Sequence, residues 1–573
     1  MPSRFRRRGI GFGLALAAAA CSDSPTAAKP DSTSTSTTNV TCTSPLTLAA
    51  GQVMPGLSGA GFCIAGGSAT AEYALIPFNG DTTDATSAFN VVAAGTASPS
   101  LAPDLISSNG PELNLIPASA ALSLSSAPTY RRSTSFEAGL RLRERTALTR
   151  LIPGARAARA RSNSRPSLDV IPSNVAVGQI LRLNTNANDP CTTPIYRGGR
   201  VVAITNQAIV VADTGNPTGG YTDDEYTSLG TAFDTLIDPL DRQAFGDVTD
   251  IDGNGHVILF FTKTVNDLTP AGSGSYIGGF FYARDLFPVQ GTADLDACAA
   301  SNYGEMFYIM VPDPSRGGAF AKANVESEVL GTLAHEYQHL INASRRMYVN
   351  DASDFEDTWL DEGLAHTAEE LLFFRVSGLQ PRQDLTATTI RASASLISAF
   401  NNYDSENFAR YSEYLSQPSG YSPYADNDSL ATRGAIWAFL RYATDHLATT
   451  DGTTFHQLVN STTTGLYNLR NVFGANVVNE IRDWGTAVLT DDLTGVANEW
   501  QMPTWNFRTM YSALINSSVF PITNVSLTAG THPVSLVRGA NAYLRFDVAA
   551  GGAASVQWTG APSTVQFTLV RVQ

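Results

Sequence analysis

Lysine is nearly absent from this chain of 573 residues, which contains only Lys29, Lys263 and Lys322. Its 37 basic residues are therefore almost all arginine, and 52 acidic residues outnumber them, which gives a formal net charge of −15. Proteins that bind nucleic acid need a surplus of basic side chains to neutralise phosphates. The charge balance therefore argues against a nucleic acid as the partner of this protein.

Long hydrophobic runs are also missing near the N-terminus. Residues 9–20 are apolar, but a helix needs about 20 such residues to cross a bilayer. Because four arginines precede this stretch and small residues end it, residues 1–20 are predicted to be a signal peptide. The string Ala-Ala-Ala-Cys that ends at Cys21 resembles a bacterial lipobox, in which the cysteine is acylated. Ordinary cleavage after an Ala-x-Ala site is the alternative.

The next segment is typical of a disordered tether. Residues 21–41 are rich in Ser, Thr, Pro and Ala and show no periodicity. We therefore expect an exported protein, either an outer-membrane or cell-surface lipoprotein or a secreted extracellular protein. On this interpretation only an N-terminal lipid contacts the membrane, and we expect a monomer.

Cysteine is scarce, with five residues in the whole chain. If Cys21 carries a lipid, the other four can form two disulfides in an oxidising compartment. Three pairings are open to four cysteines. Proximity in the sequence and location within the same predicted domain favour Cys42–Cys63 and Cys191–Cys298.

The composition excludes a wholly disordered chain, because 43% of residues are hydrophobic and only 16% are charged. The length predicts several domains. Short apolar runs predict an N-terminal β module over residues 42–120, and alternating patterns predict a C-terminal β-sandwich over residues 515–573. Between them, mixed patterns predict an α/β lobe over residues 171–320, and a helical period predicts a helical lobe over residues 321–514.

An arginine-rich segment lies between the N-terminal β module and the α/β lobe. Residues 121–170 are predicted to be an Arg-rich linker or a pro-region, and residues 131–165 contain ten arginines and two glutamates. A helix is predicted over about residues 135–151, ended by Pro153 and Gly154. A solvated linker, a cleavable pro-region and a contact with an acidic surface remain open.

The motif His-Glu-x-x-His at residues 335–339 carries the clearest chemical signal. Apolar residues recur around it at three- and four-residue spacing, which predicts a helix with both imidazoles on one face. Two such histidines can bind one Zn²⁺, and Glu336 can approach the water of the metal without being a ligand. The metzincin pattern is excluded, because Asn342 and Arg345 stand where it requires glycine and histidine.

A third ligand is available on a second predicted helix. Glu362 follows His339 by 23 residues, within the string Trp-Leu-Asp-Glu-Gly-Leu-Ala. One carboxylate presented to two histidines completes a His₂Glu site with an open position for water. These two strings, with Ala-Glu-Glu at residues 368–370, resemble the gluzincin metallopeptidases, and most of all the hyicolysin-type bacterial neutral metalloproteases.

This resemblance covers about residues 171–450. It implies an α+β gluzincin-like peptidase core, with a mixed sheet lobe and a helical lobe, flanked here by the N- and C-terminal β modules. It also implies that His335, His339 and Glu362 are the zinc ligands and that Glu336 is the general base. Asp361 stands where that family commonly has Asn.

Two functions from different classes remain. The first is an exported zinc endopeptidase that acts on protein or peptide substrates. The second is a surface lipoprotein that binds polysaccharide or protein through its β modules while an inactive peptidase-like core merely folds. The presence of Glu336 favours the enzyme. No oxyanion donor is assigned, and the candidates are His366 (which equally fits a position behind a ligand or at the surface), Tyr411, Tyr421 and Tyr424.

A calcium site is a further possibility. Residues 250–255 have the spacing of the first half of an EF-hand loop, with Asp250, Asp252, Asn254 and Gly255 at the matching positions. Phe261 stands where the bidentate glutamate belongs, so an EF-hand is excluded. A Ca²⁺-binding turn that also uses Asp247 and a plain β-turn are the alternatives.

Overall fold

The computed structural model describes residues 42, 44–99, 131–132, 134–162, 171, 174–270, 273, 275–293, 295–448, 450–514 and 520–573. The predicted signal peptide, Cys21 and the predicted tether lie outside these residues. From Cys42 onward the chain forms one compact unit. Within the described part, no helix combines the length and the apolar composition that crossing a bilayer requires.

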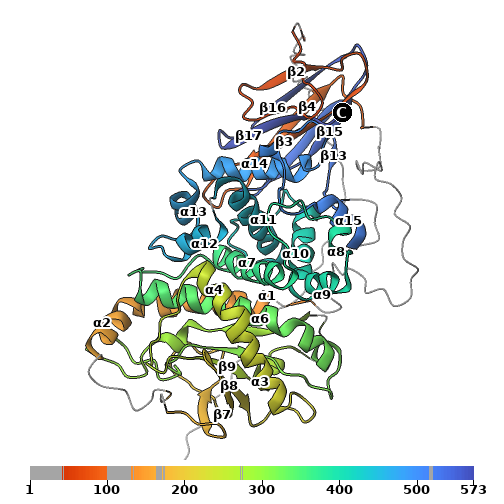
Figure 1. Cartoon of the computed structure of the whole chain (residues 1–573). Helices are drawn as coiled ribbons and strands as arrows, with labels where there is room; N and C mark the ends of the chain where they lie inside the picture. Colours follow the sequence, from red (N-terminus) through yellow and green to blue (C-terminus); the bar gives the residue numbers. More distant parts are fainter. Residues whose placement is uncertain are drawn as a thin grey trace, which may run out of the picture. The chain divides into compact units, whose positions relative to one another are not determined.

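Strands from both ends of the chain build one β-sandwich, in which red-orange and blue strands lie side by side in Figure 1. One sheet has the order β1 (Val53–Met54), β17 (Val565–Arg571), β3 (Ala71–Asn79), β15 (Leu544–Val548) and β13 (Val525–Ser526). The other has the order β14 (Gly530–Leu536), β4 (Ser87–Ala94), β16 (Ala553–Thr559) and β2 (Gly61–Ala65).

The β structure predicted at both termini is confirmed, but the prediction of two separate sandwiches is wrong. β3 pairs antiparallel with β15 and β17, and β4 pairs antiparallel with β14 and β16. All nine residues of β3 are buried, so this strand needs partners on both edges and cover on both faces. Alternation identifies a strand but carries no information on its partner, and the partners here come from the far end of the chain.

The predicted sheet lobe is a six-stranded mixed sheet. Its order is β11 (Gly279–Phe281), β12 (Met306–Ile309), β9 (Val257–Phe261), β8 (Ala208–Asp213), β7 (Tyr196–Ile204) and β6 (Ile180–Asn184). β12, β9 and β8 run parallel, whereas β11 is antiparallel to β12 and forms one edge of the sheet. This mixed sheet beside a helical lobe confirms the predicted α/β organisation of the core.

Two long helices position the candidate site. α6 (Lys322–Tyr348) packs on β11 and β12, and α7 (Thr358–Ser377) packs on α6 (Figure 1). The remaining helices of these lobes are α3 (Asp223–Ala232), α4 (Asp238–Phe245), α5 (Lys263–Asp267), α8 (Ala387–Ile390), α9 (Ala394–Tyr403), α10 (Ser405–Ser416), α11 (Leu430–Leu447), α12 (Asp451–Val459), α13 (Gly465–Phe473), α14 (Val477–Thr490) and α15 (Phe507–Leu514).

The described part of the arginine-rich segment, residues 131–132 and 134–162, is mostly helical and packed. It begins at β5 (Arg131–Arg132), which pairs with β10 (Ser275–Tyr276), and continues as α1 (Thr134–Arg143), two short helical turns and α2 (Ile152–Ser162). The prediction that Pro153 ends the helix is wrong. Pro153 lies in the first turn of α2, where a missing N–H is tolerated. Leu140, Leu148 and Ile152 are buried in the core shared with the mixed sheet, so these residues are not solvated.

Both predicted disulfides are confirmed. Cys42 is bonded to Cys63, and Cys191 is bonded to Cys298. The first closes a loop within the N-terminal part of the sandwich, and the second joins the two ends of the segment that contains most of the mixed sheet.

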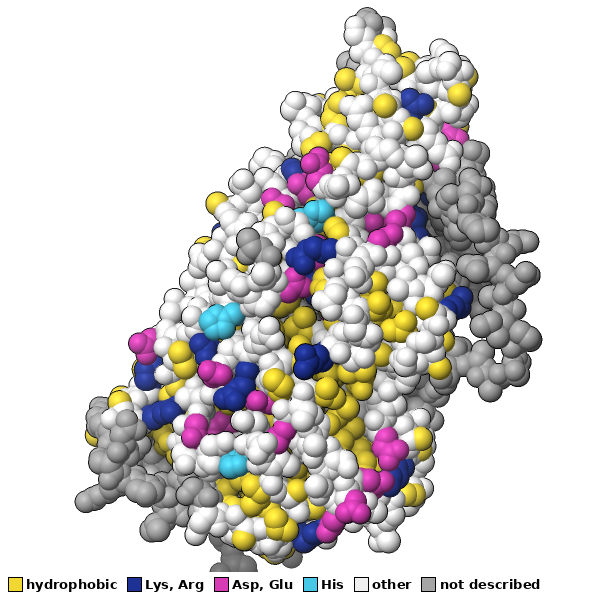
Figure 2. All heavy atoms as spheres, viewed as in Figure 1, with side chains coloured by type: hydrophobic (Ala, Val, Ile, Leu, Met, Phe, Trp, Pro, Cys, Tyr) yellow, Lys and Arg dark blue, Asp and Glu magenta, His cyan; other side chains and the backbone are white. Residues whose placement is uncertain are grey.

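Acidic and basic side chains are intermixed on the face of the molecule that Figure 2 shows. Ion pairs join many acidic and basic side chains of the described residues, such as Arg242 with Asp247 at 3.1 Å and Arg382 with Asp451 at 2.9 Å. The arginines therefore serve as local partners of the acidic residues that outnumber them.

Candidate metal centre

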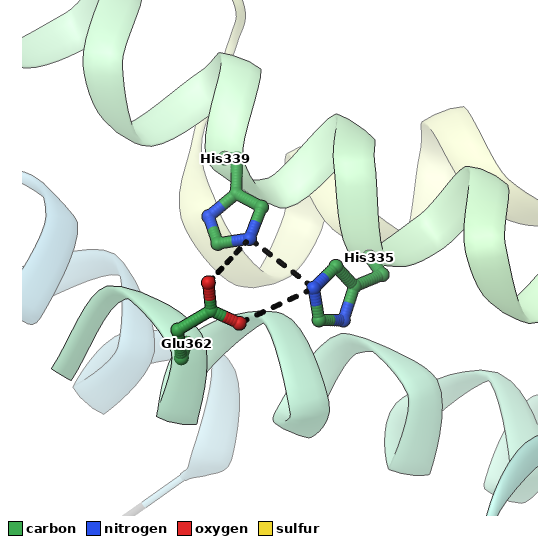
Figure 3. A group of neighbouring side chains, drawn as sticks. All are labelled: His335, His339 and Glu362. Carbon is green, nitrogen blue, oxygen red and sulfur yellow. Dashed lines mark hydrogen bonds and ion pairs between the residues drawn. The ribbon is translucent and has the colours of Figure 1, made fainter. Parts of the chain in front are cut away.

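Two helices bring the three predicted zinc ligands together. His335 and His339 lie one turn apart on α6, with their Nε2 atoms separated by 3.2 Å. Glu362 projects from α7 toward both rings, and its carboxylate oxygens lie 3.5 Å from His335 Nε2 and 3.8 Å from His339 Nε2 (Figure 3). One imidazole nitrogen from each histidine therefore converges with a carboxylate on a common point.

The donor set fits a zinc ion. The three side chains are buried, and the Glu362 carboxylate faces both imidazoles while Arg433 pairs with its Oε2 at 2.7 Å. A buried carboxylate is costly unless positive charge compensates it, and the ionised form of such a group can bind a metal ion. Two imidazole nitrogens and one carboxylate oxygen are the ligands of catalytic zinc sites that keep an open position for water.

Basic groups surround the Glu362 carboxylate. The guanidinium of Arg433 on α11 lies 2.7 Å from its Oε2, and that of Arg141 on α1 lies 3.9 Å from its Oε1. Burial raises the pKa of Glu362, but Arg433 and both histidines outweigh burial and hold that pKa well below its usual range. Glu362 is therefore ionised, as a metal ligand must be. Sequence reasoning missed both arginines, because they come from distant segments.

A carboxylate holds the far side of each imidazole. His335 Nδ1 lies 2.9 Å from Glu369 Oε1, and His339 Nδ1 lies 2.8 Å from Asp361 Oδ2. Such partners fix the ring orientation and direct the other nitrogen toward a metal. The sequence contained a signal for one of them, because Glu369 follows Glu362 by seven residues and so lies on the same face of α7.

Glu336 lies on α6 next to the histidines and reaches the edge strand of the mixed sheet. Its Oε2 accepts a hydrogen bond of 2.8 Å from the N–H of Phe281 in β11. Burial raises the pKa of the Glu336 carboxyl, and His335 and His339 oppose that rise. A carboxylate whose affinity for protons is increased, beside a metal centre, is suited to general-base chemistry.

The candidates for an oxyanion donor lie in different environments. His366 is fully buried and its ring centre lies 4.8 Å from that of His335, so the surface alternative for this residue is wrong. Its Nδ1 lies 3.6 Å from Glu369, and burial lowers its pKa well below the usual range. Tyr424 donates to the carbonyl of Asp81. Among the described contacts, none joins Tyr411, Tyr421 or Tyr424 to the three predicted ligands.

A second carboxylate cluster joins the loop before β9 to the residue directly before β12. Oxygens of Asp250, Asp252 and Glu305 lie within 4.8 Å of one another. Glu305 is 1% exposed and accepts from the N–H of Ile251 through Oε1, whereas its Oε2 has no hydrogen-bond partner among the described residues. Burial raises the pKa of Asp252 to about 7. Asp247, the other predicted participant, instead pairs with Arg242.

One known protein shows clear similarity to this chain. The chain is 32% identical over 243 residues to the neutral metalloprotease ShpI of Staphylococcus hyicus, which is 42% of this chain and 50% of that protein. It therefore spans about half the length of the curated relative it matches. No model of a known protein family matches the chain. The similarity confirms the resemblance to hyicolysin-type neutral metalloproteases that the motifs indicated.

Proposed function

We propose that this protein is a zinc-dependent endopeptidase with His335, His339 and Glu362 as metal ligands and Glu336 as the general base. The observation that carries the proposal is the convergence of three buried donors, in which the carboxylate oxygens of Glu362 lie 3.5 Å from His335 Nε2 and 3.8 Å from His339 Nε2. The similarity to a neutral metalloprotease supports it and favours protein or peptide substrates.

The residues divide the chemistry between them. Zn²⁺, when bound, lowers the pKa of a water molecule and polarises the carbonyl of a peptide. Glu336 takes a proton from the attacking water and passes it to the leaving amine. The Phe281 N–H holds Glu336 Oε2 in place, which leaves Oε1 to carry the proton. Glu369 and Asp361 keep the two imidazoles oriented throughout.

Metal analysis together with a hydrolysis assay tests this function. The purified protein should contain one equivalent of zinc and should hydrolyse a casein-type substrate. A chelator should abolish hydrolysis, and added zinc should restore it. A zinc-loaded chain that hydrolyses no protein or peptide, even after proteolytic activation, would instead favour the binding lipoprotein with an inactive core.

A calcium ion at Asp250, Asp252 and Glu305 is part of the proposal. Glu305 supplies the third carboxylate that the sequence pattern lacked at position 261, and it reaches the loop from the segment before β12. Calcium prefers several oxygen ligands, including carboxylates. Glu305 Oε2 is buried without a hydrogen-bond partner among the described residues, and one carboxylate oxygen of Glu305 lies within 4.8 Å of oxygens of both aspartates.

Thermal unfolding tests the calcium site. Adding Ca²⁺ to chelator-treated protein should raise the Tm, because a ligand that binds only the folded state stabilises it. Glu305→Gln should remove that increase. Asp267→Asn is the matched control, because Asp267 is an exposed acidic residue that pairs only locally with Lys263. A calcium-dependent Tm that survives Glu305→Gln would contradict the assignment.

The proposal also includes export of the protein from the cytoplasm. The predicted signal peptide, the two disulfides and the similarity to a neutral metalloprotease favour a protein that acts outside the cytoplasm. Mass spectrometry of the mature N-terminus should find an acylated Cys21. An unmodified terminus that begins elsewhere would favour the secreted alternative.

A further inference from the structure

We propose that residues 134–151 act as an intramolecular inhibitor that covers the metal centre and the adjoining edge of the mixed sheet. These residues form α1 and the two short helical turns after it. The inference rests on the proposed function, because it concerns access of a peptide to that same centre. It also gives the arginine-rich segment a role that its composition alone left open.

The metal centre is closed to a peptide in this structure. The three proposed ligands and the proposed base are each no more than 3% exposed. An endopeptidase must place a polypeptide chain against these groups, so something has to leave before a substrate can enter. The cavity beside the centre has one wall from the segment and one from the core, and it is lined by Arg141, Glu144, Phe281, Asn342 and Asp361 among others.

The segment contacts the third ligand through charge. The Arg141 guanidinium, 6% exposed, lies 3.9 Å from Glu362 Oε1 and is held by Glu144 at 2.8 Å. On the other side, Glu137 accepts a hydrogen bond of 2.5 Å from Arg433, the same guanidinium group that pairs with Glu362. The segment therefore places the Arg141 guanidinium beside Glu362. Through Glu137 it also binds Arg433, which already pairs with Glu362.

The segment also occupies the edge of the mixed sheet. Glu144 accepts a hydrogen bond of 2.7 Å from the N–H of Ala283, just beyond β11, and Phe136 packs on Phe280 of β11 with ring centres 5.3 Å apart. An exposed sheet edge is a ready binding surface for an extended peptide. Here the side chains of α1 and the turn after it take the positions beside that edge.

Excision of the segment from the full chain tests the inference. Recognition sequences for a site-specific protease are placed between residues 120 and 130 and between residues 163 and 170, outside the described residues. After cleavage and removal of the fragment, zinc-loaded protein should hydrolyse a casein-type substrate at least about tenfold faster than before, because several charge-assisted hydrogen bonds no longer hold the cover in place. Equal rates before and after removal would overturn the inference.

A binding assay gives a readout that does not depend on catalysis. A fluorescent peptide of residues 134–151 should bind the excised chain, and a zinc-directed peptide hydroxamate should displace it. The same peptide with Arg141→Ala should bind roughly tenfold more weakly. Arg150→Ala is the matched control, because the Arg150 side chain is 66% exposed and pairs with that of Asp296, which is 76% exposed. A peptide that fails to bind, or that the hydroxamate fails to displace, would overturn the inference.

The intact chain provides a further check if the excised chain does not stay folded. Arg141→Ala in the intact chain should raise hydrolysis above the wild-type level, and Arg150→Ala should leave it unchanged. Hydrolysis by Arg141→Ala at or below the wild-type rate would then count against the inference.

The readouts also separate the inhibitor hypothesis from the proposed function. Peptide binding without hydrolysis in either form would contradict only the function, whereas equal hydrolysis in both forms would contradict only the inhibitor.

Discussion

His339 Nδ1 lies 2.8 Å from Asp361 Oδ2, in the residue directly before the proposed third zinc ligand. Consecutive residues on a helix project about 100° apart, so Asp361 reaches the back of the His339 ring while Glu362 faces its Nε2. Glu369, two turns further along α7, holds His335 in the same way. One helix therefore supplies the third ligand and the partners of both other ligands.

Removal of the Asp361 carboxylate should weaken zinc binding without removing a ligand. Asp361→Ala should lower zinc affinity by about 10–100-fold, because the His339 ring loses the acceptor that orients it. Asp361→Asn should have a smaller effect, because its amide oxygen can still accept. Competition with a chromophoric chelator measures the affinity. Glu326→Gln, an exposed position on α6, is the control, and an Asp361→Ala protein that matched it would contradict the assigned role.

Zinc binding should depend on pH through His335. Burial lowers the pKa of this imidazole, but hydrogen bonds with Glu362 and Glu369 outweigh burial and raise the pKa to about 10 in the metal-free protein. At neutral pH the ring therefore carries a proton that zinc must displace. The apparent affinity should rise about tenfold per pH unit between about pH 6 and 8, and calorimetry in two buffers should detect at least one released proton. A pH-independent affinity would show that the metal-free ring is neutral.

The sandwich should hold its N-terminal strands without a covalent link. A single cut between residues 100 and 130, outside the described residues, separates β1–β4 from the rest of the chain. Because β3 and β4 each lie between two C-terminal strands, both fragments should elute together in size-exclusion chromatography. Reduction should not release the N-terminal fragment, since Cys42–Cys63 lies within it. An N-terminal fragment that elutes alone in native buffer would contradict the shared sandwich.

The parts of the site that the sequence could predict depend on local spacing. His335 and His339 converge because a helix brings residues four apart onto one face, and the surrounding apolar period indicates that helix. The burial of His366 is harder to predict, because polar and apolar residues are interspersed around α7 and their pattern does not distinguish a buried face from an exposed one.

The parts that the sequence could not predict depend on contacts between distant segments. Arg141 and Arg433 reach Glu362 from α1 and α11, and no spacing rule joins residues so far apart. Glu305 completes its carboxylate cluster in the same non-local way. The shared sandwich is the largest example, because β3 pairs with β15 and β17 from the opposite end of the chain.

Substitutions at Glu336 and Glu362 should separate the proposed base from the proposed ligand. Glu336→Gln keeps an oxygen that can accept from the Phe281 N–H but removes the basic oxygen. Zinc content should stay near one equivalent while turnover falls by about 10²–10⁴ or more, the usual contribution of a general base. Zinc analysis beside a hydrolysis assay measures both effects, and wild-type turnover would exclude Glu336 as the base.

Glu362→Gln should behave differently, because it changes a metal ligand that is also the counter-charge of a buried arginine. Zinc occupancy should fall together with activity, and excess zinc should restore part of the rate. The Tm should also fall even without metal, because Arg433 then faces a neutral group at 2.7 Å and, among the described residues, keeps only Asp428 and Glu137 as acidic partners. Glu336→Gln replaces no such partner, so its metal-free Tm should stay close to that of the wild type. A Glu362→Gln protein that bound zinc as tightly as the parent would move the third ligand to His366 or Glu369, which share the same helix and already approach His335.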